Sequence, residues 1–200
     1  DFIAVGSEAV STMLSPDGVS WVETPVTPEQ EWRGICWSPE LNLFVAVSVT
    51  GVGSRVMTSV DGATWTLRTT PADVSWRAVC WAPALGLFVA VASDGSPSQV
   101  MTSPNGITWT LRSTPLSDNW MAVVWSQELG LFVATAAAGA VITSPDGITW
   151  TPRSLPAAYI WRSVCWSTET GLFVAVSNSG VATQVMTSPD GITWTLRSTP

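Results

Sequence analysis

Three arginines occupy equivalent places in a repeated segment of this chain. Arg33, Arg77 and Arg162 stand in the segments WRGICW, WRAVCW and WRSVCW, and Met121 takes their place in WMAVVW. A guanidinium binds a carboxylate through two parallel hydrogen bonds, so three arginines brought together would clamp an acidic ligand. Tyr159, the single tyrosine, is a further candidate for ligand binding. The competing interpretation is structural, because an arginine beside a tryptophan often stacks on the indole ring.

The sequence contains few side chains that are suited to acid–base catalysis. The chain contains no histidine, the side chain best suited to proton transfer near neutral pH. Hydrolysis of a glycosidic bond requires two carboxyl groups in different environments. Four of the eight aspartates recur at one position of a turn motif, which indicates a structural role, and the sequence identifies no repeat-specific glutamate to act with Tyr159. We therefore expect no catalytic residue and no cofactor.

The cysteines also occupy equivalent positions. They are Cys36, Cys80 and Cys165, and Val124 takes the fourth position. A position that accepts valine is a small apolar core position. Equivalent positions in neighbouring repeats are expected to lie too far apart for a disulfide or a shared metal ion. The sequence predicts buried free thiols and no metal site.

The aspartates belong to a turn motif that occurs five times, first as SPDGVSW from Ser15 and last as SPDGITW from Ser188. Proline presets φ near about −65°, aspartate accepts hydrogen bonds from amides of its own turn, and glycine supplies φ > 0. The tryptophan three residues after the glycine is expected to begin a strand and to lie between neighbouring repeats. The residues expected to form these turns are Asp17, Gly18, Asp61, Gly62, Asn105, Gly106, Asp146, Gly147, Asp190 and Gly191.

The turn motif defines the repeats and the fold class. Its glycines recur at intervals of 44, 44, 41 and 44 residues. Four-stranded units of this length, apolar on both faces, are typical of stacked β-propeller blades, whereas solenoid repeats are usually shorter. We predict an all-β fold, a single domain over 1–200 that forms a β-propeller of five four-stranded blades. The expected repeats are 1–31, 32–75, 76–119, 120–160 and 161–200, and the strands expected in the third are Trp76–Ala82, Leu87–Ala92, 99–103 and 107–113.

The first repeat lacks a segment of the WRxVCW type, so its blade is expected to lack the innermost strand. The neighbouring strand would then have unpaired backbone groups at its inner edge. We expect the strand to come from residues outside this chain or from another copy. The chain opens on Asp1 without a secretory signal, which suggests a window from something longer, and a larger ring in a longer parent is the alternative to five blades.

The turn motif resembles the Asp-box of the bacterial neuraminidase repeat family, whose pattern is Ser-x-Asp-(x)-Gly-x-Thr-Trp. Five copies cover essentially the whole chain, and glycine follows aspartate directly, as in shorter variants of the box. The resemblance implies a propeller in which the box joins the third and fourth strands of each blade. Sialidases clamp a substrate carboxylate with three arginines from different blades, which Arg33, Arg77 and Arg162 resemble. However, the chain has no Phe/Tyr-Arg-Ile-Pro segment of the kind that contains the first sialidase arginine.

Composition narrows the range of partners. Eight arginines against fifteen carboxylates give a net charge of −7, which disfavours nucleic acid. With 46% hydrophobic and 12% charged residues, the chain is expected to fold. The longest nearly apolar run, 129–142, is too short to span a bilayer and aligns with hairpins elsewhere, so no membrane insertion is expected.

Sequence variation among the repeats points to one face of the propeller. The loops between second and third strands and the connections between blades share a face, and they vary while the turn motif does not. These segments are 49–54, 93–98, 137–139 and 178–183, with connections 25–31, 72–75, 116–119 and 157–160. Variable loops on a rigid scaffold are where recognition usually occurs, although unconstrained drift would give the same pattern.

Three functions are compatible with these features. The first is a non-catalytic binding or adhesion module for a glycan or protein ligand, and the second is a repeat scaffold within a larger surface or virion assembly. A sialidase-like glycosidase ranks third, because its carboxylate pair is missing from the pattern. The expected setting is a cell surface or a virion.

Overall fold

Each repeat folds into one antiparallel sheet in the computed structural model, which describes residues 2–6, 11–25, 29–95, 99–180 and 184–198. Parts of the predicted variable segments, at 26–28, 96–98 and 181–183, lie outside the described residues. Blade one consists of β1 (Phe2–Val5), β2 (Ser11–Ser15) and β3 (Val22–Pro25). Blade two consists of β4 (Trp32–Ser38), β5 (Leu43–Ser48), β6 (Val56–Ser59) and β7 (Thr66–Arg68).

The remaining three blades repeat this order of strands. Blade three consists of β8 (Trp76–Ala82), β9 (Leu87–Ala92), β10 (Val100–Ser103) and β11 (Thr110–Arg112). Blade four consists of β12 (Trp120–Ser126), β13 (Leu131–Ala136), β14 (Val141–Ser144) and β15 (Thr151–Arg153). Blade five consists of β16 (Trp161–Ser167), β17 (Leu172–Ser177), β18 (Val185–Ser188) and β19 (Thr195–Arg197). In the described chain the single helical segment is the 3-10 turn η1 (Pro83–Leu85), and no helix is long and apolar enough to cross a membrane.

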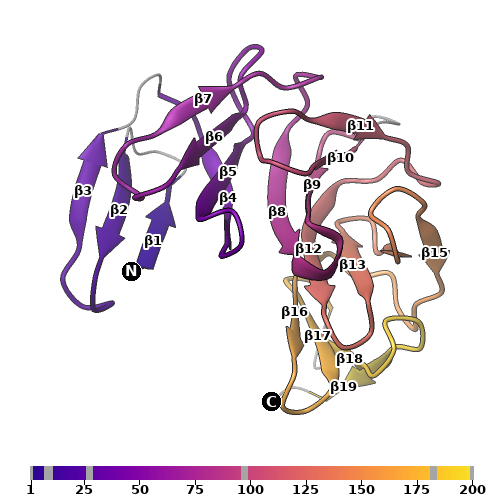
Figure 1. Cartoon of the computed structure of the whole chain (residues 1–200). Coiled ribbons are helices and arrows are strands. Elements are labelled where there is room, and N and C mark those ends of the chain that lie inside the picture. Colours follow the sequence, from indigo (N-terminus) through magenta and orange to yellow (C-terminus); the bar gives the residue numbers. More distant parts are fainter. Residues whose placement is uncertain (1, 7–10, 26–28, 96–98, 181–183, 199–200) are drawn as a thin grey trace.

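The five sheets follow one another around an arc (Figure 1). The first strands of blades two to five, β4, β8, β12 and β16, lie side by side along its inner side. The two chain ends lie at opposite ends of the arc, with an opening between blade one and blade five. The fold is the predicted all-β propeller of five blades. Among the described residues blade one has three strands and β1 pairs only with β2, so the blade lacks an innermost strand there, as expected.

The strands of blade three test the predicted boundaries. The first two strands match the prediction, whereas β10 begins at Val100 and β11 covers only Thr110–Arg112. The predicted fourth strand, 107–113, was too long because the amides of Ile107 and Thr108 donate to Oδ1 of Asn105, each at 2.9 Å. These residues therefore complete the turn and do not pair with β10.

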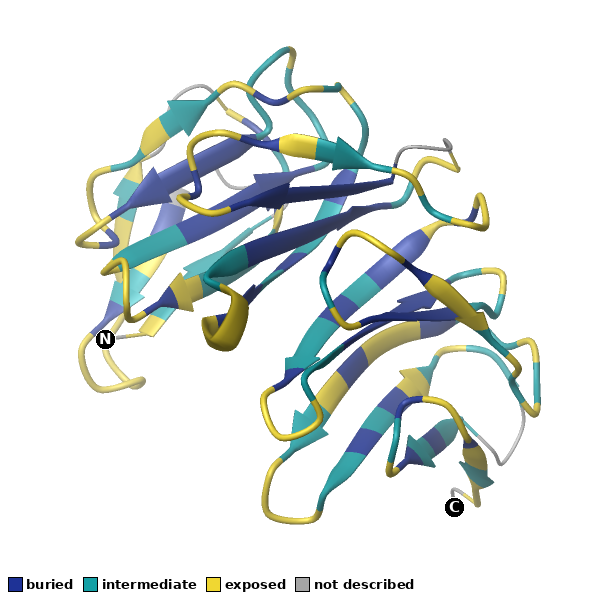
Figure 2. Cartoon of the chain, turned by 45° about the vertical axis from the view of Figure 1, so that its right-hand side comes forward, coloured by how far each residue is buried: buried dark blue, intermediate teal, exposed yellow. Residues whose placement is uncertain are grey.

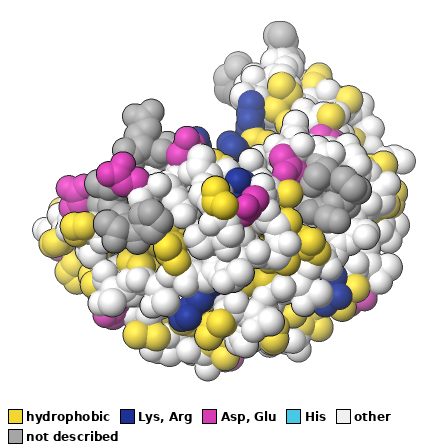
Figure 3. Space-filling model, turned by 90° about the horizontal axis from the view of Figure 1, so that it is seen from above, with side chains coloured by type: hydrophobic (Ala, Val, Ile, Leu, Met, Phe, Trp, Pro, Cys, Tyr) yellow, Lys and Arg dark blue, Asp and Glu magenta, His cyan; other side chains and the backbone are white. Residues whose placement is uncertain are grey.

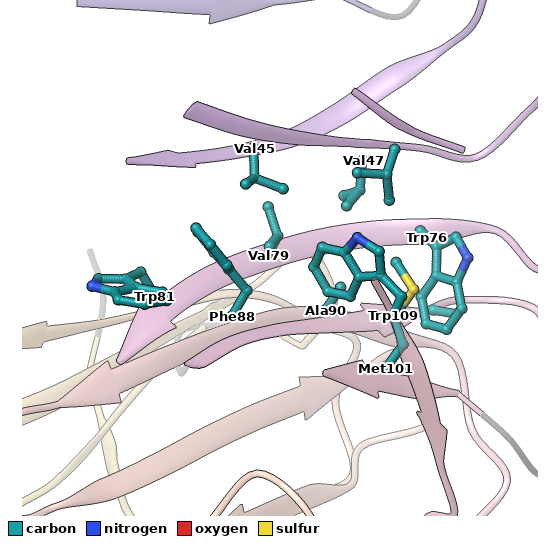
Figure 4. Packing of buried hydrophobic residues seen from close by; sticks show 11 residues of the cluster. Val45, Val47, Trp76, Val79, Trp81, Phe88, Ala90, Met101 and Trp109 are labelled. Atoms are coloured by element: carbon teal, nitrogen blue, oxygen red, sulfur yellow. The ribbon is translucent and has the colours of Figure 1, made fainter. Parts of the chain in front are cut away.

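The core lies between blades. We call the face of a blade that contacts the next blade its trailing face, and the face that contacts the preceding blade its leading face. Between blades two and three the trailing face presents Val45, Val47 and Val56, all fully buried. The opposing leading face includes Phe88, Met101 and Trp109 (Figure 4), and each fully buried aliphatic or aromatic side chain contributes about 1.5–3 kcal/mol.

The glycine of the turn motif has two roles at this interface. Gly106 has φ +71°, in the left-handed region that favours glycine, so the turn requires it locally. A Cβ at Gly106 would also lie 2.9 Å from the side chains of Leu43 and Val45 on the preceding blade. The turn therefore packs glycine backbone directly against the neighbouring trailing face.

The tryptophan of the turn motif is buried in blades three to five and partly buried in blade two, where it is Trp65. Trp109, Trp150 and Trp194 are 7%, 6% and 6% exposed, which confirms the predicted position between blades. The prediction that the tryptophan begins the strand was wrong, because β11 begins one residue later at Thr110. Trp21 of blade one is 42% exposed, so the prediction was wrong there, because in this structure no other blade lies against the face that contains Trp21. At the other end of the arc, blade five is exposed for the same reason, because no blade of this chain lies against its trailing face.

The cysteines are free thiols whose burial depends on the following blade. Cys36 and Cys80 are partly buried, and desolvation is the first cause that raises the pKa of each thiol. Cys165 is exposed, so the prediction of a buried thiol was wrong for blade five. Figure 2 shows the corresponding change, from dark blue strands in the middle of the arc to banded teal and yellow strands in the C-terminal sheet.

Candidate functional site

A β-bulge in each inner strand contains the candidate arginines. In β8, Trp76 pairs with Ala92 and Ala78 pairs with Val91, which leaves Arg77 as an extra residue without a partner in β9. The same irregularity leaves out Arg33, Met121 and Arg162 in β4, β12 and β16. A bulge re-aims the side chain of the extra residue, and bulges are frequent beside functional sites. Sequence analysis found these arginines but missed the bulge, because one inserted residue hardly disturbs a strand that is apolar on both faces.

The three arginines come from separate blades and act on one another. Partial burial first, and then the like charges of Arg33 and Arg162, lower the pKa of Arg77. The guanidinium nevertheless stays protonated. Seen from above, basic side chains gather around the hollow between the two arms of the molecule (Figure 3). The structure thus brings together the three positions that the sequence only showed to be equivalent.

Gly34 allows the inner strands β4 and β8, which contain two of these arginines, to lie close together. A Cβ at Gly34 would lie 2.9 Å from both the Cα of Ala78 and the carbonyl oxygen of Arg77. Backbone atoms cannot yield as a flexible side chain does, so a larger residue here would separate β4 from β8. The sequence signal is the glycine itself, at a position where the other repeats have alanine or serine.

The acidic partners of the three arginines are few. The Arg33 Nη2 donates to the Glu31 Oε2 at 2.9 Å, and the two side chains are 36% and 43% exposed. An exposed pair of this kind contributes about 0–1 kcal/mol, so a ligand can displace it at little cost. Neither the Arg77 nor the Arg162 side chain makes a hydrogen bond or ion pair within the described part of the chain.

The other five arginines have structural contacts. In the fourth strands, each Nε donates to a threonine hydroxyl of the third strand at 2.8–3.0 Å, and these pairs are Arg68–Thr58, Arg112–Thr102, Arg153–Thr143 and Arg197–Thr187. Arg55 donates to the carbonyl oxygens of Gly51 and Val49 and holds its loop together. The bulged arginines therefore differ from the rest in having side chains not engaged by such contacts.

Tyr159 packs within blade five. Its ring lies 5.8 Å from that of Trp161 between centroids and lies directly against the backbone of Gly180, where a Cβ would meet the ring at 2.9 Å. These contacts give Tyr159 a packing role at the base of a variable loop. Its assignment as a ligand-binding residue stays a prediction.

The variable loops share a position and differ in their internal bonds. In blade two, the Gly53 amide donates to Asp73 Oδ1 at 2.6 Å. In blade three, the buried Gln99 side chain bonds the backbone of Asp118 in both directions and accepts from Trp120 Nε1 at 3.0 Å. Sequence analysis did not single out these polar residues. Gln99 has a counterpart in Gln184 of blade five, but there the Nε2 donates to the carbonyl oxygen of Gly180 at 3.1 Å, so the shared residue makes different bonds in the two blades.

The opposite face, which we call the box face, uses its carboxylates in turns. In blade two, Asp61 accepts the amides of Thr64 at 2.7 Å and Ala63 at 2.9 Å, and these bonds, followed by the Ser59 hydroxyl, lower the pKa of Asp61 to about 2. Burial raises the pKa of Asp146, but its amide hydrogen bonds outweigh burial and the net shift is downward. Carboxylates held in this way are strong hydrogen-bond acceptors and poor general acids.

Each turn motif on the box face also uses its serine and tryptophan. In blade four the Ser144 Oγ accepts the Gly147 amide at 2.8 Å, and the Trp150 Nε1 donates to the Gly147 carbonyl at 3.2 Å. Among the residues that the structure describes, no group of three His, Cys, Asp or Glu side chains could hold a metal ion.

Open space remains beside the missing strand of blade one. A cavity of about 170 Å³ is lined by Ile3 of β1, by Ile35, Cys36 and Trp37 of β4, and by Phe44. In the later blades, adjacent first strands pack side by side at this level. The inner edge of blade one therefore combines unpaired backbone with an apolar hollow.

Comparison with known proteins identifies the fold. No protein-family model matches, and no curated protein sequence matches. A chain of a nidogen/laminin complex superposes with a TM-score of 0.73 at 10% identity over 97% of this chain and 76% of that one. A chain of YCF48 bound to D1 peptide gives 0.69 at 15% identity over 98% and 63%, and the GH74 enzyme of Niastella koreensis gives 0.64 at 16% over 97% and 29%. This chain thus spans less than two thirds of the latter two chains, and all three share its fold.

Proposed function

We propose that this chain is a non-catalytic binding module of the Asp-box type, and that its variable face binds an acidic group of a glycan or protein. The observation that supports it is the convergence of Arg33, Arg77 and Arg162 on β-bulges of three blades. Like charges held close together destabilise a fold. An anionic ligand that binds between them supplies the counter-charge and removes this repulsion, which favours binding. Recognition by charge-assisted, bidentate hydrogen bonds follows from the guanidinium geometry.

Two further features support binding over catalysis. The recurring aspartates are engaged by turn amides on the box face, whereas each arginine is the second residue of its inner strand, next to the variable connection that enters the blade. Among the fold neighbours, the nidogen/laminin and YCF48–D1 peptide structures are complexes with protein or peptide partners. The Asp-box assignment is part of this proposal and rests on four turns with Ser-Asp-Gly-Trp hydrogen bonds and on a fifth, in blade three, in which Asn105 makes the bonds of the aspartate.

The test is a binding titration with acidic and neutral ligands. An array of sialylated, uronate-containing and neutral glycans, together with acidic and neutral peptides, would be probed with the wild type and with Arg77→Gln. We expect acidic ligands to bind and Arg77→Gln to weaken them about tenfold or more, because a hydrogen bond to a charged group is worth about 1.5–3 kcal/mol. Binding should also weaken with added salt.

Arg197→Gln is the matched control, since it removes the same charge at the outer edge of blade five and should leave the affinity unchanged. Preference for neutral ligands, or equal loss in both variants, would reject the proposal. Turnover of a fluorogenic sialoside by the wild type would show glycosidase activity and would reject the proposal of a non-catalytic module.

A further inference from the structure

The trailing face of blade five is uncovered. Its valines Val174, Val176 and Val185 are the counterparts of Val45, Val47 and Val56, which are fully buried between blades two and three. On blade five, Val176 is 42% exposed and the other two are only partly buried. Cys165 is exposed on the same blade, whereas its counterparts Cys36 and Cys80 are covered by the next blade.

The leading face of blade one is uncovered as well. Phe2, Met13 and Trp21 are 57%, 46% and 42% exposed. Their counterparts on blade three, Phe88, Met101 and Trp109, are 0%, 0% and 7% exposed. Large apolar side chains that cluster on one exposed face commonly mark a site of protein contact.

These two faces are the separated halves of one interface. Within the chain, equivalent trailing positions meet equivalent leading positions at each step from blade two to blade five, with Thr135 replacing one valine and Ile142 replacing the methionine in blade four. The contact is specific at the turn glycine, because Gly106 lies against Leu43 and Val45, and Gly147 against Leu87 and Val89. Blade five retains the receiving pair as Leu172 and Val174, and blade one retains the glycine as Gly18.

We propose that a second copy of this chain docks head to tail, with the leading face of its blade one on the trailing face of blade five. Gly18 of the incoming copy would lie over Leu172 and Val174, and Phe2, Met13 and Trp21 would cover Val176. The contact is heterologous, because the two surfaces differ, so it forms either a closed ring of copies or a longer chain of them. Blade one has no inner strand to contribute, so the contact repeats the outer part of the internal interface. This inference is independent of the ligand proposed for the variable face.

The test is the mass of the whole chain in solution over a concentration series, measured by light scattering after size exclusion. We expect the mass to at least double from 21.2 kDa as concentration rises. Val176→Asp blocks the trailing face and Met13→Asp blocks the leading face, so each variant alone should be monomeric. A one-to-one mixture of the two should form a dimer and nothing larger, because one intact face remains on each variant. Formation of that dimer also shows that both variants are folded.

Val52→Asp is the control, since Val52 is 88% exposed in a loop between β5 and β6 and should leave association unchanged. A wild type that stays monomeric at all concentrations overturns the proposal. A variant that remains oligomeric on its own would show a like-with-like contact through its intact face, and would overturn the proposal. Failure of the two variants to associate with each other, with the wild type oligomeric, would also overturn it.

Discussion

The turn of blade three and the turn of blade one contain the same local hydrogen bonds. The Ser103 Oγ accepts the Gly106 amide at 2.8 Å, and the Ser15 Oγ accepts the Gly18 amide at 2.8 Å. In blade three, however, the turn lies against blade two, while in blade one no blade lies in front of it. The turn therefore forms within its own seven residues, and its burial depends on a neighbour.

The largest effect should come from truncating the tryptophan of each turn. Trp109→Ala is expected to lower the free energy of unfolding by about 3–5 kcal/mol, since the indole is almost fully buried and leaves a cavity between blades. Trp21→Ala should cost about 1 kcal/mol because much of that indole is already in water. Urea unfolding of both variants measures the difference. Equal losses would mean that the indole acts through its own turn.

A smaller difference should appear at the two glycines. Both have positive φ, +71° at Gly106 and +76° at Gly18, so alanine introduces backbone strain of about 1–2 kcal/mol at either position. Gly106→Ala also forces a Cβ against Leu43 and Val45, and overpacking adds about 1–3 kcal/mol. At Gly18 the nearest atom to a Cβ would be 3.5 Å away, in the ring of Phe2.

Thermal unfolding of the two glycine variants separates strain from interface. A Gly106→Ala variant no less stable than Gly18→Ala would show that contact with the preceding blade adds nothing to the cost. A Gly18→Ala variant as stable as the wild type would show that the turn tolerates the left-handed conformation with a side chain.

The smallest effect is a pH dependence that differs between turns. Hydrogen bonds hold the pKa of Asp61 at about 2, below its ordinary 3.8, so the ionised carboxylate stabilises the fold above pH 4. This stabilisation is lost as pH falls from about 4 to about 2, where the carboxylate protonates in the folded state. Asp61→Asn should flatten the pH dependence in that window, since Asn105 makes the same bonds in blade three without titrating.

The converse exchange is the matched control. Asn105→Asp should steepen the loss of stability between pH 4 and pH 2, as seen in urea midpoints at the two pH values. If the Asp61→Asn slope equals that of the wild type, the lowered pKa does not contribute to folding stability.

Much of the fold was predictable because the turn motif and the apolar runs are local in sequence and recur in each repeat. The intervals between turn glycines indicated a five-bladed propeller, and the apolar runs gave the bounds of β8 and β9. The fourth strands were predicted too long, because residues such as Ile107 have high β propensity but their amides bond to the turn. For the candidate site, the sequence indicated which arginines are equivalent. The β-bulge that re-aims their side chains could be found only in the strand pairing of the structure.

The sequence by itself determined the turns, the strands and their order, because hydrogen bonds such as those between Ser15, Asp17 and Gly18 form between residues at most three apart. The tertiary structure alone decided which copies of a repeated residue are covered. Trp21 and Trp109 have the same local sequence role, as do Cys165 and Cys80, yet one of each pair is exposed. The physical reason is that burial depends on a neighbouring blade, and the arc leaves the first and last blades without one.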